Sequence, residues 1–333
     1  MVNKKRLLIL FVFLFLATLL DSYVYPSNSK ELRTRCLQII EEGLLSDNET
    51  SRLDSISNIE RLKIVNPSIE EKILEIFLKD PSEVVRAAST YSLVRFKGKS
   101  AIPMLKKALE CKGRQAYLIH LSASIALYNL GEKDSLKVIT KYLDSENKAE
   151  SVEAAISVGN LHNGDIIPLL RVRLSTKNQF LKNALLESLA RLGDKISDEA
   201  IRLLLESELF DSQWTALSII DILKDKRFNL KLKKKLESDN PLMRIKTAKL
   251  LSILSNENKK SIIIEYLLSD RNSYSGISVE DVKVLAIYNG LFEIGDKSDL
   301  PLLKKYLDKG NRERLMAAGS IIAILNRLEE SKT

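Results

Sequence analysis

Residues 80–96 read DPSEVVRAASTYSLVRF, a stretch in which small and large apolar residues recur three and four positions apart. Ser89, Leu93 and Phe96 share one side of an α-helix at this spacing, because a helix turns once every 3.6 residues. The stretch therefore predicts a helix whose buried stripe includes one small contact position. The rest of the chain decides whether this helix is unique or one copy of a repeated unit.

The position of Leu93 recurs along most of the chain. Successive equivalents are 31, 34, 31, 31, 31, 31, 40 and 31 residues apart: Leu62, Leu93, Leu127, Val158, Leu189, Ile220, Leu251, Leu291 and Ile322. The residue three positions later is always apolar, and the residue four positions earlier is usually small. A fixed period of this length is typical of stacked helix pairs. We predict an all-α fold over residues 30–328, an α-α superhelix of about nine helix pairs.

Helix ends follow the same period. Gly131, Gly193 and Gly295 lie four residues past the reference position, where a helix can end in a left-handed residue that glycine tolerates. Ser68–Glu71 and Ser278–Asp281 have the spacing of a capping box at a helix start. Each unit is therefore expected to hold two short helices that depend on their neighbours for stability.

The DPSEVVRAAS segment resembles the second-helix signature of HEAT repeats, and the 31-residue unit resembles the short variant of the phycobilisome-lyase-like HEAT class. First helices of the IPLL type, at 102–105, 167–170 and 300–303, fit the same resemblance. It implies a solenoid whose second helices line a concave binding surface. The sequence departs from the family in that Arg86 recurs only at Arg244, and HEAT units are commonly longer.

The N-terminus has a different composition. Lys4, Lys5 and Arg6 precede a fourteen-residue stretch, Leu7–Leu20, that is apolar except for Thr18, and a polar stretch follows. This order is typical of a secretory signal, and the apolar run is short for a bilayer crossing. We interpret residues 1–25 as a signal peptide or a short membrane anchor. The protein is accordingly expected to be exported, periplasmic or secreted, with membrane contact only through an uncleaved N-terminus.

Nine stacked pairs would extend about 80 Å, because packed helices lie about 8 to 10 Å apart. Two gaps exceed the period, and the longer one is assigned to the polar stretch Arg271–Val279, with Tyr274 at its middle. Repeat proteins place insertions in loops, often on a binding face. Tyr274 is therefore a candidate contact residue, and an unselected surface loop is the alternative.

Positive charge concentrates in residues 224–249, which contain ten Lys and Arg residues and three Asp and Glu residues. This segment predicts a surface for an anionic partner. A solvated lysine-rich helix is the competing interpretation. The candidate binding residues are Lys231, Lys234, Lys235, Arg244, Lys246 and Lys249, together with Tyr274.

The sequence contains no recognisable catalytic or metal-binding signature. His120 and His162, the only histidines, fall in different units, and neither cysteine has zinc-ligand spacing. No phosphate-binding loop or nucleophile-elbow motif occurs. Trp214, the only tryptophan, is expected to be buried between repeats. The sequence predicts no catalytic residues, no cofactor and no metal, and the protein is not expected to be an enzyme.

These observations favour an exported, non-enzymatic scaffold that binds a protein or cell-envelope partner on its concave face. The resemblance also permits a HEAT-like lyase that acts on a chromophore, or a HEAT-like protein that binds nucleic acid. The export signal argues against both alternatives. Residues 329–333 are interpreted as a C-terminal tail.

Overall fold

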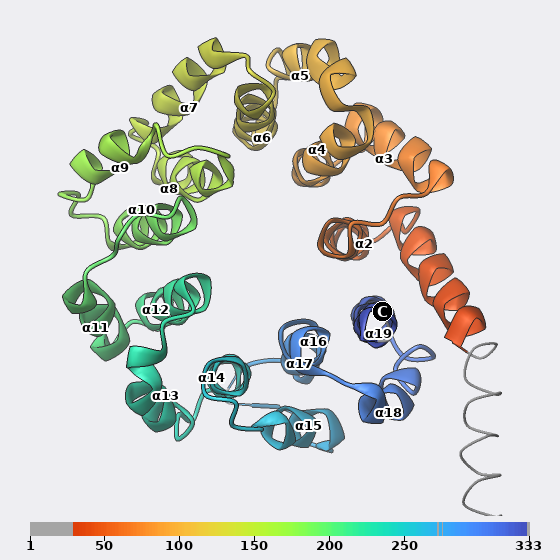
Figure 1. The fold of residues 1–333 in the computed structure, drawn as a ribbon. Coiled ribbons are helices and arrows are strands. Elements are labelled where there is room, and N and C mark those ends of the chain that lie inside the picture. Colours follow the sequence, from red (N-terminus) through yellow and green to blue (C-terminus); the bar gives the residue numbers. More distant parts are fainter. Residues whose placement is uncertain (1–28, 272, 275, 332–333) are drawn as a thin grey trace, which may run out of the picture.

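The computed structural model describes residues 29–331 except 272 and 275, so the signal peptide or anchor predicted for residues 1–25 lies outside the described residues. The all-α prediction is confirmed, and the described residues form nine helix pairs in two concentric layers (Figure 1). Among these residues, no helix combines the length and the apolar character that a bilayer crossing requires.

The inner layer contains the second helix of each pair. Its members are α2 (Glu49–Leu62), α4 (Glu83–Lys97), α6 (Ala116–Asn129), α8 (Lys148–Ser157), α10 (Gln179–Arg191), α12 (Phe210–Leu223), α14 (Pro241–Leu254), α16 (Val279–Leu285) with η5 (Ala286–Leu291) and α17 (Phe292–Ile294), and α19 (Asn311–Glu330). The outer layer contains the helix over 29–44, then α3 (Pro67–Lys79), α5 (Ile102–Ala108), α7 (Leu136–Leu143), α9 (Ile167–Arg173), α11 (Asp198–Glu206), α13 (Asn229–Lys235), α15 (Lys260–Leu268) and α18 (Leu300–Lys304).

The periodic positions form the core between the layers. Eight of the nine reference residues are buried, and the ninth, Leu62, is partly buried against the same core. The position four residues earlier is fully buried in every unit, including Leu185 and Ile287, where it is not small. The 31-residue period therefore marks the face on which each inner helix packs.

Two of the predicted glycine helix ends are confirmed, since φ is 105° at Gly131 and 80° at Gly193. Lys224 takes the equivalent left-handed position with φ at 50°. The prediction for Gly295 is wrong, because its φ is −67°; a Cβ there would lie 2.4 Å from the carbonyl oxygen of Leu291, so this glycine permits close packing.

The N-cap half of the prediction at Ser278 is confirmed, because its hydroxyl accepts from the Asp281 N–H at 3.0 Å. The prediction at Ser68 is wrong. Asn66 is the N-cap of α3, and its side chain accepts from the Ser68 N–H at 2.8 Å. Asparagine is as good a cap as serine, and Pro67 fits the first turn that follows it.

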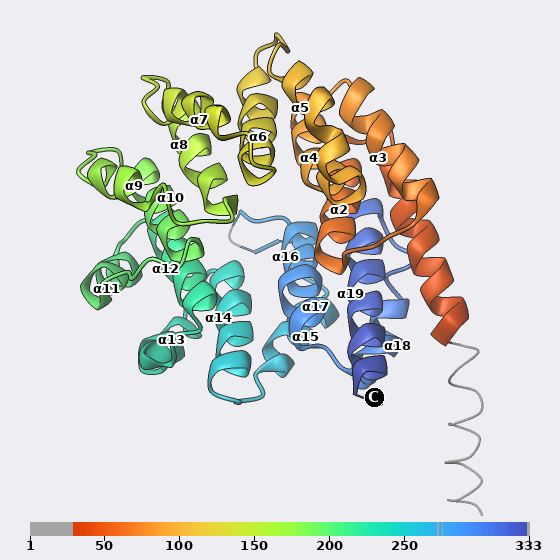
Figure 2. The ribbon, with the colours of Figure 1, turned by 45° about the horizontal axis from the view of Figure 1, so that its top comes forward.

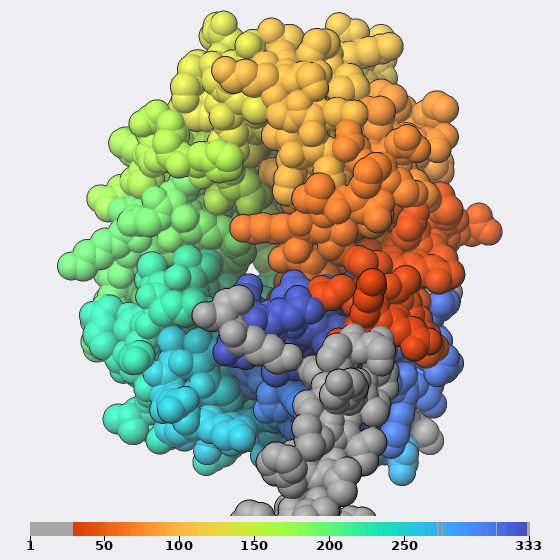
Figure 3. All heavy atoms as spheres, turned by 45° about the vertical axis from the view of Figure 1, so that its right-hand side comes forward, coloured from red at the N-terminus to blue at the C-terminus, as the bar shows by residue number. Residues whose placement is uncertain are grey.

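The stack does not stay open. α19 packs against α2, so the nine pairs close into a ring and the expectation of an extended stack about 80 Å long is wrong (Figure 1). The N-terminal units lie directly against the C-terminal units on the molecular surface (Figure 3). Small buried residues on the inner helices let those helices approach more closely than the outer ones, which explains the curvature.

We call the contact between the two ends of the chain the seam. The Asn58 amide donates to the carbonyl oxygen of Leu315 at 3.0 Å, and both residues are buried. Gly319 provides the space, because a Cβ there would lie 1.9 Å from Asn58 Oδ1. Among the described residues, five arginine–carboxylate pairs also cross the seam: Arg33–Glu329, Arg35–Asp308, Arg61–Glu293, Arg312–Asp54 and Arg314–Glu42.

The predicted insertion forms the connection between α15 and α16, where Tyr274 and Ile277 make one isolated antiparallel bridge (Figure 2). Part of the extra length lies in the following inner helix, because η5 is a π-helical turn. Such turns interrupt α-helices at functional sites more often than elsewhere. The insertion and η5 therefore mark this unit as different from the other eight.

Candidate functional site

A cavity of about 520 Å³ lies on the inner side of the ring, at the rim where the inner helices begin. We call it the lumen cavity. Helices from both ends of the chain and from the middle contribute to it, so it exists only because the ring is closed. Its lining residues are Asp54, Ser57, Phe210, Trp214, Leu242, Ile277, Asp281, Val284, Leu285, Tyr288, Asn289, Arg312 and Met316.

Aromatic residues form one wall of the lumen cavity. Phe210 and Trp214, one turn apart on α12, stack with ring centroids 5.6 Å apart, and Phe210 is 39% exposed. Large exposed aromatic rings are typical of binding surfaces. Trp214 is partly buried and faces the lumen, although the sequence suggested burial between repeats.

The opposite wall is polar. Arg312 on α19 lies 3.1 Å from a carboxylate oxygen of Asp54 and 2.9 Å from one of Asp281. Burial raises the pKa of Asp54, and the Arg312 guanidinium opposes that shift. Two carboxylates around one guanidinium give this wall a net negative charge, so it would favour a positively charged group on a ligand.

The π-helical turn supplies Tyr288 and Asn289 to the cavity. The Tyr288 hydroxyl makes a short hydrogen bond with Ser57 of α2. Arg61 stacks 4.0 Å from the Tyr288 ring centroid and 3.7 Å from that of Phe292. These contacts fix Tyr288 across the seam, because each of its partners on α2 comes from the other end of the chain.

Lys246 and Lys249, two of the candidate binding residues, lie on α14 and are buried. The Lys246 amine lies 3.9 Å from the Trp214 ring centroid and donates to Ser218 Oγ at 2.6 Å. Burial lowers the pKa of Lys246 to about 7. Lys249 pairs with Asp221 at 2.5 Å and Glu293 at 3.1 Å, so neither amine is available to an external anion without rearrangement.

Lys231, Lys234 and Lys235 lie on α13 in the outer layer. Lys231 pairs with Glu206, Lys235 donates to the Gln213 side chain at 2.9 Å, and Lys234 is exposed. The structure therefore does not gather the lysines of residues 224–249 on one surface, because consecutive helices of a pair belong to different layers.

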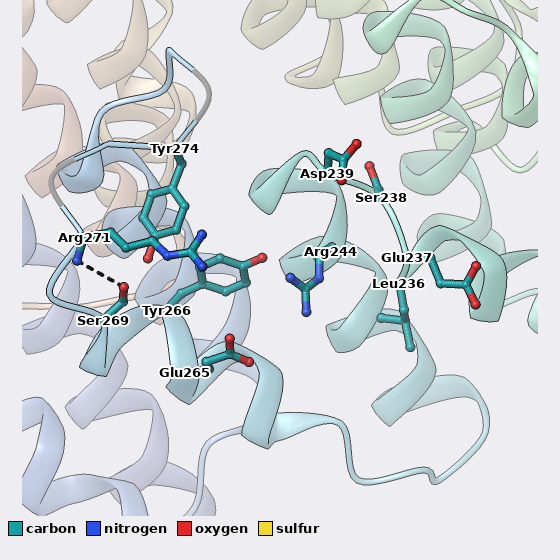
Figure 4. A pocket seen from close by; sticks show the side chains of 10 residues that line it. All are labelled: Leu236, Glu237, Ser238, Asp239, Arg244, Glu265, Tyr266, Ser269, Arg271 and Tyr274. Carbon is teal, nitrogen blue, oxygen red and sulfur yellow. Dashed lines mark hydrogen bonds between the residues drawn. The ribbon is translucent and has the colours of Figure 1, made fainter.

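Arg244 and Tyr274 are brought together. They line a second cavity, of about 320 Å³, between the α13–α14 loop, the end of α15 and the insertion (Figure 4). We call it the Arg–Tyr cavity. Its lining residues are Leu236, Glu237, Ser238, Asp239, Arg244, Glu265, Tyr266, Ser269, Arg271 and Tyr274, and none of them lines the lumen cavity.

Metal chemistry has no candidate centre in the described part of the chain, where no cluster of three His, Cys, Asp or Glu side chains could hold an ion. His120 bonds to the Tyr142 hydroxyl at 2.6 Å and to the Cys111 carbonyl oxygen at 2.9 Å. Both of its ring nitrogens therefore have structural partners.

The lumen cavity was not anticipated from the sequence. Its residues come from five inner helices and the insertion, and they follow no motif. One available signal was the presence of Gly43 and Gly319 inside helices, since glycine there is unfavourable unless another element approaches closely. Both lie at the seam that creates the cavity.

No family model matches this chain. No curated protein matches it in sequence. Among solved structures, human deoxyhypusine hydroxylase in complex with glycerol aligns with 84% of this chain and 99% of its own, at 15% identity and a TM-score of 0.36. An engineered protein aligns with 87% of this chain and 99% of its own, at 13% identity and a TM-score of 0.29.

One of these structures corrects an expectation. The chain was not expected to be an enzyme, and a hydroxylase is among the proteins whose structures align with most of it. The expectation that this chain is not an enzyme is therefore wrong. The paired, all-helical repeats of this chain form a HEAT-like solenoid.

Proposed function

We propose that this chain is an exported HEAT-like ring that binds an extended segment of a protein or cell-envelope partner in its lumen cavity. The observation that carries the proposal is that the Phe210–Trp214 stack, in which Phe210 is exposed, and the Asp54–Arg312–Asp281 cluster line the same cavity. Export is inferred from the N-terminal sequence pattern alone.

The closed ring limits what the partner can be. A long concave face could hold a folded domain, whereas a cavity of about 520 Å³ holds a few side chains. The wall chemistry favours an aromatic or aliphatic side chain against Phe210 and Trp214, beside a basic group near Asp54 and Asp281. A flexible segment with this composition fits better than a rigid globular surface.

Nucleic-acid binding is not favoured. A basic groove would require the lysines of residues 224–249 to form a continuous surface, and they are divided between an outer helix and a buried inner helix. No observation favours the chromophore lyase either.

Trp214 provides a direct test, because it is the only tryptophan of the chain and lines the cavity. Its fluorescence would be followed while two short peptides are added, one with phenylalanine beside arginine and one with phenylalanine beside glutamate. We expect the basic peptide to change the emission at a concentration at least about tenfold lower than the acidic peptide needs. Equal responses, or none, would contradict the proposal.

A photo-crosslinking amino acid in place of Phe210 would test the same site in the native host. The matched control is the same replacement at Phe180, which is 59% exposed at the start of α10 and does not line the cavity. We expect a product from position 210 that disappears in the Asp54→Asn, Asp281→Asn variant and is absent from position 180. Identical products from both positions would indicate nonspecific capture.

A further inference from the structure

The Arg–Tyr cavity contains buried donors that lack acceptors. Tyr274 is only 6% exposed, and its hydroxyl has no hydrogen-bond partner among the residues that the structure describes. Arg244 Nε is also buried without a partner. A buried donor without an acceptor is destabilising, so two of them at one cavity indicate that a ligand supplies the acceptors.

The guanidinium groups at this cavity are not neutralised. Among the described residues, neither Arg244 nor Arg271 has a carboxylate within ion-pair distance, in contrast to the arginines of the seam. Instead, Arg244 lies 5.5 Å from the Tyr266 ring centroid and Arg271 lies 5.6 Å from that of Tyr274. Figure 4 shows Arg271 with the two tyrosines on one side of the cavity and Arg244 facing them.

Three acids also line the cavity and must be considered. Glu237, Asp239 and Glu265 are exposed. In Figure 4 the Glu237 carboxylate points away from the tyrosines, and Asp239 lies beyond Arg244 on the far side. Glu265 lies beside Tyr266 in the same view, so two of the acids lie away from the tyrosines and the third lies next to the donors. This arrangement suits a ligand whose negative head carries a positive or hydroxylated tail.

The insertion explains how this chemistry arose in one unit. It supplies Arg271 and Tyr274, and the Tyr266 and Tyr274 rings pack edge to face with centroids 5.5 Å apart. These residues belong to one unit only, because the next reference residue again follows after 31 residues. Arg86 holds the position of Arg244 in its own unit but lines neither cavity.

We propose that the Arg–Tyr cavity binds a phosphoryl group carried by a small molecule or a lipid headgroup. Guanidinium forks and hydroxyls that approach from several directions match a tetrahedral oxyanion, which accepts hydrogen bonds on all sides, better than a planar carboxylate. A volume of about 320 Å³ leaves room for a substituent beyond the phosphate. The proposal does not rest on partner binding in the lumen cavity.

Calorimetric titration of the purified protein with inorganic phosphate and with phosphoethanolamine would test the proposal, with chloride at equal ionic strength as the blank. We expect phosphoethanolamine to bind more tightly than phosphate. Arg244→Gln should weaken binding at least about tenfold, and Tyr274→Phe should weaken it several-fold, because each removes donors to a charged group. Tyr274→Phe keeps the ring contact with Tyr266, so its fold should persist.

The control is Arg86→Gln, which changes the equivalent arginine of another unit and should leave binding unchanged. Sedimentation with phosphatidylethanolamine vesicles, compared between the wild type and Arg244→Gln, distinguishes the two sources. Arg244-dependent sedimentation assigns the group to a headgroup, and binding of the free ester alone assigns it to a small molecule. Absence of binding to every probe, or equal loss in Arg86→Gln and Arg244→Gln, would overturn the proposal.

Discussion

Two contacts between inner helices, α10 with α12 and α19 with α2, join the ring in different ways. In the first, neighbours along the chain meet through apolar residues and one buried hydrogen bond, from the Asn183 amide to Ser212 Oγ at 3.1 Å. In the second, residues more than 250 positions apart meet through a buried amide–carbonyl bond and arginine pairs. The α10–α12 contact closes a segment of fewer than 20 residues that includes α11, whereas the seam must offset the entropy of closing almost the whole chain.

The difference shows where each contact is encoded. Packing between neighbours follows the 31-residue period, because every unit presents the same stripe. The seam depends on residues that depart from the period, such as Asn58 at a position that is usually small and Gly319 inside a helix. If this account is correct, changes at the seam and between neighbours should have distinguishable effects.

The largest effect is expected for Gly319→Ala. Alanine normally stabilises a helix interior by about 1 kcal/mol relative to glycine. Here its Cβ would overlap the Asn58 amide, so we expect a loss of about 1 to 3 kcal/mol in the free energy of unfolding. Urea denaturation measures this change.

Gly310→Ala is the control for that substitution, because nothing lies within 4 Å of a Cβ at Gly310. It should change stability by less than about 1 kcal/mol. A Gly319→Ala variant that is as stable as the wild type, or more stable, would show that the seam is not tightly packed.

Arg312→Gln should have the next largest effect. The change leaves Asp54, whose side chain is 13% exposed, without its guanidinium partner, and we expect a cost of about 1 to 2 kcal/mol. Lys137→Gln is the comparison, since it breaks the exposed pair with Asp134 and should leave the free energy of unfolding essentially unchanged. Equal costs in urea denaturation would remove the distinction between the seam and an ordinary surface pair.

Lys246→Met tests a contact between neighbours, α12 and α14. The pKa of Lys246 is about 7 in the folded protein and higher in the unfolded chain, so the unfolded chain binds more protons between these values. Wild-type stability should therefore rise as pH increases from about 7 toward 10, and Lys246→Met should flatten this rise.

At pH 7 and below, Lys246→Met should be more stable than the wild type by about 1 kcal/mol, because it removes the cost of burying a charge. Lys234→Met, at an exposed position on the outer helix, should leave the pH profile unchanged. Denaturation curves across pH 6.5 to 9.5 measure both effects. A wild-type stability that falls over this range would contradict the buried position of Lys246.

The smallest effect is expected for Arg314→Gln. Its pair with Glu42 crosses the seam, but the side chains are 38% and 48% exposed. We expect a loss below about 0.5 kcal/mol that disappears at high salt, because exposed pairs are screened. A cost larger than that of Arg312→Gln would mean that the rim of the seam, rather than its buried side, holds the ring closed.

The helix pairs could be predicted because burial repeats with the chain. Leu93 and its equivalents recur at a fixed interval and all contribute to the core, and the insertion before α16 was recognised as a change in that interval. The closed ring could not be predicted this way. Closure results from many small rotations between units, and the period does not specify their sum.

The sites were harder to predict because a local count of charge ignores the two layers. Lys231 and Lys246 are close in sequence, but one lies on an outer helix and the other is buried on an inner helix. Trp214 was expected to be buried between repeats, and it is only partly buried. Trp214 lines the lumen cavity, and α2 and α19, which come from the two ends of the chain, complete that cavity.

Small-angle X-ray scattering of residues 26–333 tests the closed ring most directly. A compact chain of this length has a radius of gyration of about 19 Å, and the ring should measure about 20 to 22 Å. An open stack about 80 Å long would give about 26 Å or more. A value in the first range supports closure through α2 and α19, and a value in the second would contradict the ring and the lumen cavity with it.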